Sequence, residues 1–91
     1  AYSREHSATA KTLANLGLVY LQLRDTKKAK TLLEKALKIQ ENTYGTEHPV
    51  VAETLVNLSS VVGELGDAAE AKTMSERALA IQEKIYGPEH P

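Results

Sequence analysis

The 91-residue sequence contains no cysteine, which excludes disulfide bonds, thiolate catalysis and zinc sites with cysteine ligands. Its formal net charge of −1 gives no reason to expect nucleic acid or an acidic membrane surface as a partner. No apolar run is long enough to cross a bilayer, and the patterns of phosphate-binding loops, nucleophile elbows and metalloprotease helices are missing. We therefore expect no enzyme activity, no metal and no cofactor, and the lack of cysteine is compatible with a reducing, cytoplasmic location.

What the sequence does contain is a motif that recurs at a fixed interval. The stretch YGTEHP at residues 44–49 returns as YGPEHP at residues 86–91, and a diverged copy, YSREHS, occupies residues 2–7. The histidines of these copies therefore stand 42 residues apart: His6, His48 and His90. Such regular spacing indicates whole periods of a structural repeat.

The repeat extends well beyond this motif. Pairing residues 6–47 with residues 48–89 gives 21 identities among the 42 pairs, far more than chance allows. With 42% hydrophobic and 25% charged residues, the composition is that of an ordinary globular chain, and its length suits one small domain. We therefore predict a single domain over residues 1–91, with repeat 1 at about 6–47, repeat 2 at about 48–89 and partial junction motifs at both ends.

Both halves of each repeat have the spacing of amphipathic helices. Apolar and small residues step by three or four positions from Ala10 to Leu23, and again from Ala29 to Gln40. No alternating run of β-branched residues competes with this pattern. We therefore predict an all-α fold of four helices, at about residues 7–23, 26–43, 49–65 and 67–85.

The turns inside the repeats carry residues suited to ending one helix and starting the next. Asp25 and Asp67 are placed to cap the second helix of each repeat, and Glu70 completes a capping-box pattern with Asp67. Gly66 suits the left-handed residue that closes a helix. Arg24 holds the same position in repeat 1, where a left-handed conformation is strained for a residue with a side chain.

Between the repeats, glycine and proline mark the boundary. Gly45 and Gly87 are predicted to end the second helices with the same left-handed geometry as Gly66. Pro49 suits the first turn of the next helix, where its missing amide does no harm. Small residues at seven-residue spacing on the inner face of the second helices let neighbouring helices approach closely: Ala29, Ala36, Ala71 and Ala78.

A period of 42 residues alone does not identify the repeat class, since tetratricopeptide repeats average about 34 residues and HEAT or armadillo repeats about 40–47. The order of large and small anchor residues resembles the tetratricopeptide repeat: Leu13, Leu16, Gly17, Tyr20, Ala29, Leu33 and Ala36. The longer unit, with EHPVVAETLVNL and ERALAIQEKIYGPEHP, looks like the 42-residue repeats of kinesin light chains. This resemblance implies an α-solenoid of two stacked helix-turn-helix units, a fragment of a right-handed superhelix.

The resemblance also implies a concave, peptide-binding face formed by the first helix of each repeat. We expect that face to include these residues: Lys11, Asn15, Leu18, Gln22, Glu53, Asn57, Ser60 and Glu64. In kinesin-light-chain-type arrays the asparagine matching Asn15 and Asn57 bonds the backbone of an extended peptide. An interhelix hydrogen bond that fixes the stacking register is an equally open interpretation of the two residues.

The repeated histidines have a simpler interpretation than a metal or acid–base site. Equivalent positions in stacked repeats lie on the order of 20 Å apart, so the three side chains cannot converge on one ion. We expect them to be loop and helix-entry residues. The tyrosines of the same motif are expected to seal the joints between repeats: Tyr2, Tyr44 and Tyr86.

The last helix lacks a following repeat in this sequence, so part of its apolar surface is expected to stay uncovered: Met74, Leu79, Ile81 and Ile85. We therefore predict self-association, by end-to-end stacking or by exchange of a hairpin between chains. Two function classes remain open. The domain is an interaction module that binds an extended peptide or a helix, or it is a structural spacer whose contacts are to other copies or flanking repeats.

Overall fold

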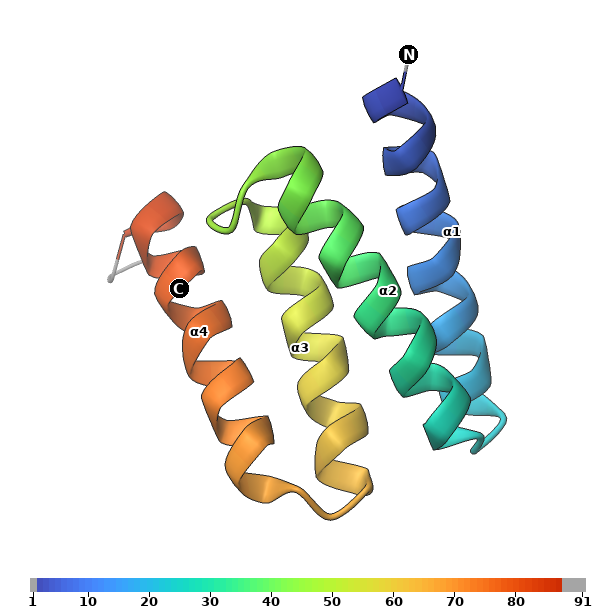
Figure 1. Ribbon diagram of the computed structural model, residues 1–91. Helices are drawn as coiled ribbons and strands as arrows, with labels where there is room; N and C mark the ends of the chain where they lie inside the picture. The colour runs from blue at the N-terminus through green and yellow to red at the C-terminus, as the bar shows by residue number, and fades with distance from the viewer. Residues whose placement is uncertain (1, 88–91) are drawn as a thin grey trace.

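A computed structural model describes the backbone of residues 2–87 and the side chains of residues 7–87. The described chain is all-α, as predicted, and contains no strand within residues 2–87. Its four helices follow one another in a single row (Figure 1): α1 Tyr2–Gln22, α2 Thr26–Tyr44, α3 Pro49–Glu64 and α4 Ala68–Tyr86. Within the described residues, no helix is both long enough and apolar enough to span a lipid bilayer.

The helices pack pairwise as two helix-turn-helix units. α1 packs along α2, α3 packs along α4, and α2 joins the two units by packing on α3. α1 and α3 meet over a much smaller surface, and α1 does not reach α4 anywhere in the described chain. The molecule is a slab of 37 × 35 × 19 Å, so its helices form an open stack and do not close into a four-helix bundle.

One aspartate at each turn both closes a helix and opens the next. The amide of Asp25 donates to the carbonyl of Tyr20 at 2.8 Å, while its carboxylate accepts from the amide of Lys28. Arg24 supplies the left-handed residue between them, with φ 68°, as predicted from its position. The arrangement is a Schellman motif that merges with an N-cap, which is why the three residues from Leu23 to Asp25 suffice to reverse the chain.

The second turn repeats this geometry with Gly66 at φ 98°, and the amide of Glu70 donates to the Asp67 carboxylate at 3.0 Å. The predicted capping box is only half formed. Its second bond needs the amide of Asp67, but that amide donates to the carbonyl of Val62 at 3.0 Å and so already serves the end of α3.

The joint between the units is built differently from these turns. Gly45 and Gly87 have positive φ, as predicted, but their ψ values of 171° and 154° are extended and not left-handed helical. This combination is open essentially only to glycine. His48 caps α3 through Nδ1, which accepts from the amide of Val50 at 3.1 Å, and Pro49 occupies the first turn of that helix.

The start of α1 differs from the prediction. The helix begins at Tyr2 and not near residue 7, so the diverged motif YSREHS is helical and does not form a junction. The physical reason is the loss of both helix breakers, because serines at positions 3 and 7 stand where the second copy has Gly45 and Pro49. His90 lies outside the described residues, and His6 lies in the helix with its side chain outside the described set.

The core lies along the middle of the slab and depends on small residues of the second helices. Ala29, Ala36 and Ala78 are fully buried, whereas Ala71 is partly buried. Around them pack two clusters of apolar side chains, and Leu37 and Met74 contact both. The clusters share these residues across α2, α3 and α4, so the two units form one continuous core.

Candidate functional site

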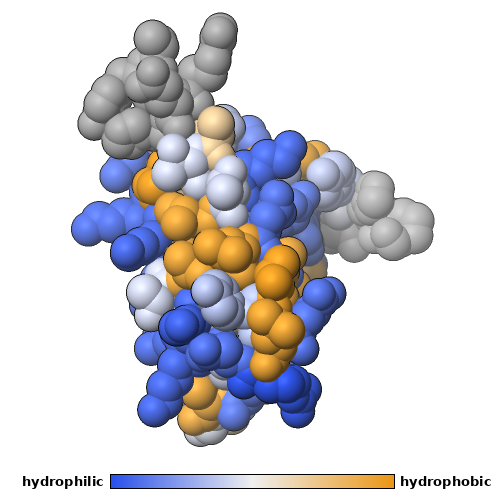
Figure 2. Space-filling view, turned by 90° about the vertical axis from the view of Figure 1, so that its right-hand side faces the viewer, coloured by the Kyte–Doolittle hydropathy of each residue, from blue (hydrophilic) through white to orange (hydrophobic). Residues whose placement is uncertain are grey.

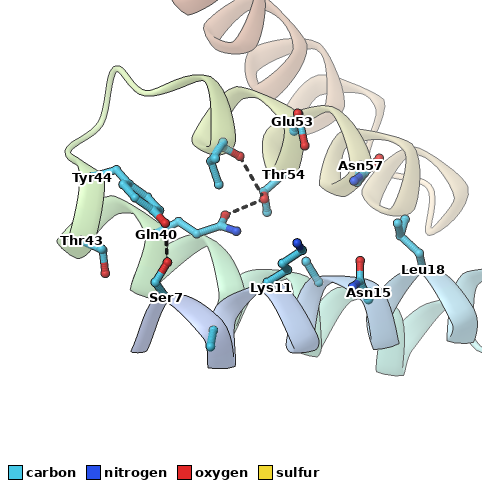
Figure 3. Close-up of a pocket in the computed structure, with 13 residues that line it drawn as sticks. Ser7, Lys11, Asn15, Leu18, Gln40, Thr43, Tyr44, Glu53, Thr54 and Asn57 are labelled. Atoms are coloured by element: carbon cyan, nitrogen blue, oxygen red, sulfur yellow. Dashed lines mark hydrogen bonds between the residues drawn. The ribbon is translucent and has the colours of Figure 1, made fainter. Parts of the chain in front are cut away.

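A cleft of about 770 Å³ opens between the first helices of the two units, with the end of α2 behind it (Figure 3). Its walls come from α1 and α3, because these helices lie on the same side of the slab and α2 fills the space between them only in part. The residues that line the cleft are Ser7, Ala8, Lys11, Ala14, Asn15, Leu18, Gln40, Thr43, Tyr44, Val50, Glu53, Thr54 and Asn57.

Helical spacing explains which side chains reach the cleft. On α1, Lys11, Asn15 and Leu18 are separated by four and three positions, so they project from one face. On α3, Glu53 and Asn57 occupy the positions 42 residues beyond Lys11 and Asn15. The repeat therefore places two equivalent pairs of side chains on facing walls.

Five of the eight predicted concave-face residues line this cleft, namely Lys11, Asn15, Leu18, Glu53 and Asn57. The other three do not line it and are exposed at the far ends of α1 and α3: Gln22, Ser60 and Glu64. The cleft is confined to the end of the groove near the joint between the units, where Tyr44 and the start of α3 form its back.

The contribution of α2 was not foreseen from the sequence. Gln40, Thr43 and Tyr44 line the cleft from the end of this helix. Gln40 and Tyr44 are identical to their equivalents in repeat 2, Gln82 and Tyr86. This identity was the sequence feature that could have pointed to a role for the end of α2.

A buried hydrogen bond forms the floor of the cleft. The hydroxyl of Thr54 donates to Oε1 of Gln40 at 2.5 Å, and it also lies 3.2 Å from the carbonyl of Val50. Gln40 and Thr54 are both almost fully buried. This bond links α2 to α3 and so fixes the register between the two units. In the sequence analysis, Asn15 and Asn57 were the candidates for that role.

The end of the cleft is closed by tyrosine. The hydroxyl of Tyr44 hydrogen-bonds that of Ser7, which connects the end of α2 to the start of α1. The Tyr44 ring also stacks on the His48 ring, with centroids 4.4 Å apart and planes 23° apart. Tyr44 thus contacts both units at their joint.

The polar side chains of the walls are available to a ligand. Among the residues whose side chains are described, no hydrogen-bond partner is found for the amide of Asn15 or of Asn57. Figure 3 shows the two asparagines on opposite walls, with Lys11 on α1 and Glu53 on α3. The walls therefore offer two neutral amides, one cation and one anion.

Among the described residues, no group of three or more histidine, cysteine, aspartate or glutamate side chains is placed to hold a metal ion. His48 acts as a helix cap, which agrees with its prediction as a helix-entry residue.

The predicted uncovered flank of α4 requires correction. Ile81 is only 1% exposed and belongs to a core cluster, and Met74 is partly buried against both clusters. Leu79 is 53% exposed and Ile85 is also exposed. Leu79 and Ile81 are two positions apart, about 200° around the helix, so they cannot lie on one stripe.

Comparison with known families agrees with this architecture. The chain matches the family profile described as tetratricopeptide repeat over residues 8–84, which spans both helix-turn-helix units. A comparison with curated proteins gave no match. The profile covers most of the sequence, and the four helices pack pairwise as two such units. The chain therefore belongs to the tetratricopeptide repeat family.

Proposed function

We propose that this chain is a cytoplasmic protein–protein interaction module that binds an extended peptide segment in the cleft between α1 and α3. Tetratricopeptide repeats generally serve as protein interaction modules and are typically not catalytic. The observation that carries the proposal is the pair of asparagine amides, Asn15 and Asn57, which face the cleft without a partner among the described side chains.

An asparagine amide suits the backbone of an extended peptide. It offers one acceptor and two donors, so it can pair with both the N–H and the C=O of a peptide unit. An extended strand advances about 3.3 Å per residue, and its peptide groups remain unpaired until a partner supplies hydrogen bonds. Two equivalent amides on facing walls are a suitable arrangement for holding such a segment by its main chain.

The remaining wall residues supply preferences for the side chains of the ligand. Leu18 gives the α1 wall an apolar position, and Glu53 gives the α3 wall a negative charge. A ligand with a hydrophobic anchor and a basic residue fits this pattern. Glu64, predicted as a concave-face residue, does not line the cleft, so the proposal assigns the preference for a basic ligand residue to Glu53 alone.

We also propose that the units are of the 42-residue, kinesin-light-chain-like type. The helix lengths support this assignment, since α2 and α4 each have 19 residues and the interval between equivalent caps Asp25 and Asp67 is one full period. A shorter repeat would place the two caps closer together.

Peptide binding tests the proposal directly. The probe is an array of extended peptides that carry one large apolar and one basic residue, and the best binder is followed by fluorescence anisotropy. We expect Asn15→Ala and Asn57→Ala each to weaken binding about 2- to 10-fold, the effect of about 0.5–1.5 kcal/mol for one hydrogen bond. Asn42→Ala is the matched control, because Asn42 is exposed on α2 and does not line the cleft.

The charge preference is tested in the same assay. Glu53→Lys should weaken binding of the basic peptide and leave a neutral version unaffected, whereas Glu76→Lys, exposed on α4, should change neither. Unchanged binding in both asparagine variants, with helicity retained, would contradict the proposal. Loss of helicity in those variants would instead support the alternative function, a structural spacer in which the asparagines hold the repeats together.

A further inference from the structure

Equivalent residues of the two repeats differ sharply in exposure at one end of the stack. Leu58 and Val61 of α3 are 1% and 0% exposed, because α2 packs over them with Ala29 and Leu33. Their equivalents on α1 are the same residue types, Leu16 and Val19, yet these are 42% and 46% exposed. The α1 face is thus a copy of a surface that is covered elsewhere in the same molecule.

Figure 2 views the molecule from the α1 side and shows apolar side chains gathered in its middle, bordered by polar residues. The exposed large apolar residues of α1 and the following turn are Leu16, Val19 and Leu23.

The opposite end of the stack shows the complementary difference. Leu37 of α2 is partly buried and packs against both core clusters, whose members come from α2, α3 and α4. Its equivalent on α4 is again a leucine, Leu79, and this side chain is 53% exposed. The outer face of α4 is therefore a copy of the α2 surface that covers α3.

We propose that a second copy of this chain docks its α1 onto α4 of the first copy, in the register by which α3 docks onto α2. The exposed face of α1 corresponds to the α3 side of the internal α2–α3 interface. The exposed face of α4 corresponds to its α2 side. The contact is heterologous, joining one end of the stack to the other, so each docked pair keeps one free face of each kind for a further copy.

The hydrogen bond that fixes the register inside the molecule is available at the proposed contact. Gln40 and Thr54 form that bond between α2 and α3. Their equivalents are identical in type, Gln82 on α4 and Thr12 on α1, so Gln82 of one copy meets Thr12 of the next.

Charge is complementary as well. Arg77 of α4 pairs with Glu41 of α2 across the internal joint. The equivalents of these residues at the proposed contact are Lys35 of the second copy and Glu83 of the first, which again have opposite sign and are exposed. An isologous contact of two α4 faces lacks this matching, because it would bring the two copies of Glu83 and the two polar Gln82 side chains to one interface.

Sedimentation equilibrium of single variants separates these arrangements. Leu16→Glu damages only the α1 face and Leu79→Glu only the α4 face, and both side chains are already exposed enough to tolerate the change. We expect the weight-average mass of the wild-type chain to rise with concentration above the 9.9 kDa of one copy. Each variant alone should remain at one-copy mass, while an equimolar mixture should reach a plateau at twice that mass, because one intact face of each kind survives.

Lys38→Glu is the control, since Lys38 is exposed on α2 and its equivalent on α4, Ala80, is exposed as well, and this variant should associate like the wild type. Val19→Lys and Gln82→Ala serve as second variants of the two faces if circular dichroism shows that a glutamate variant has unfolded. A wild-type chain that stays at one-copy mass at millimolar concentration would overturn the proposal. So would a mixture without heterodimers, or a Leu16→Glu variant that still dimerises, the result that an α4–α4 contact requires.

Discussion

The two helical glycines of this chain should respond to the same substitution with opposite signs. A Cβ atom at Gly17 would lie 3.0 Å from Cγ and 3.3 Å from Cδ2 of Leu33, and 3.4 Å from the carbonyl oxygen of Ala29. Leu33 is fully buried in a core cluster, so it has little room to move away. Replacing glycine by alanine stabilises a helix interior by about 1 kcal/mol, but overpacking costs about 1–3 kcal/mol. We expect Gly17→Ala to destabilise the fold by about 1 kcal/mol.

Gly63→Ala is the matched comparison. Its Cβ would lie 3.7 Å from the Cβ of Ala71, an ordinary van der Waals distance, and no other contact opposes it. Gly63 stands near the end of α3, so we expect a reduced helix gain, a stabilisation of about 0.5 kcal/mol. Urea unfolding followed by circular dichroism at 222 nm measures both variants, with midpoints compared at unchanged slope.

A Gly17→Ala variant at least as stable as the wild type would refute the reasoning, because Leu33 would then be free to yield. The second repeat supports the expected sign. Its equivalents of Gly17 and Leu33 are Ser59 and Ser75, so a side chain appears at the first position only where the second has become small.

Substitutions at three further sites, each with its comparison, test the turns and the floor of the cleft by the same unfolding assay. Thr54→Val should destabilise the fold by about 1–3 kcal/mol, because it leaves the buried side-chain oxygen of Gln40 without its donor. Thr12→Val is the control. Thr12 is exposed on α1, so this change should alter the stability of the monomer by less than about 0.5 kcal/mol. Arg24→Gly should stabilise the fold by about 0.5–1 kcal/mol, since a left-handed φ of 68° is unfavourable for any residue with a Cβ; an unchanged midpoint would mean that contacts of the arginine offset the strain. Asp67→Ala should lose about 1 kcal/mol of capping and Asp67→Asn much less, and equal losses would show that the carboxylate charge matters more than the hydrogen bond.

The helices could be predicted from the sequence because their limits are set by local chemistry. The expected segments 26–43, 49–65 and 67–85 agree with α2, α3 and α4 to within one residue at each end, since aspartate, glycine and proline mark every boundary. The start of α1 was wrong by five residues. There the boundary was inferred from similarity to the repeat motif, although the glycine and proline that break the helix in the other copies are absent.

The candidate site was predictable only where a single helix determines it. The spacing of Lys11, Asn15 and Leu18 fixes a common face whatever surrounds α1, and all three line the cleft. The share of Gln40 in the cleft and the burial of Ile81 depend instead on how far neighbouring helices diverge and how each is rotated. Those quantities arise from packing across the whole stack, and helical periodicity leaves them undetermined.

The proposed stacking and the proposed peptide site are connected, because the bond that fixes the register also forms the floor of the cleft. Where α2 docks on α3, the Gln40–Thr54 bond lies at the bottom of the cleft between α1 and α3, the first helices of the two units. Docking of α1 from a second copy onto α4 would reproduce this arrangement, with Gln82 and Thr12 as the new floor. The walls of the new cleft would be α3 of one copy and α1 of the next. Ser60 is the equivalent of Leu18, so it would line that second cleft, although it lies outside the first. A peptide long enough to cross both clefts would contact two copies at once, and its binding should therefore strengthen their association by mass action.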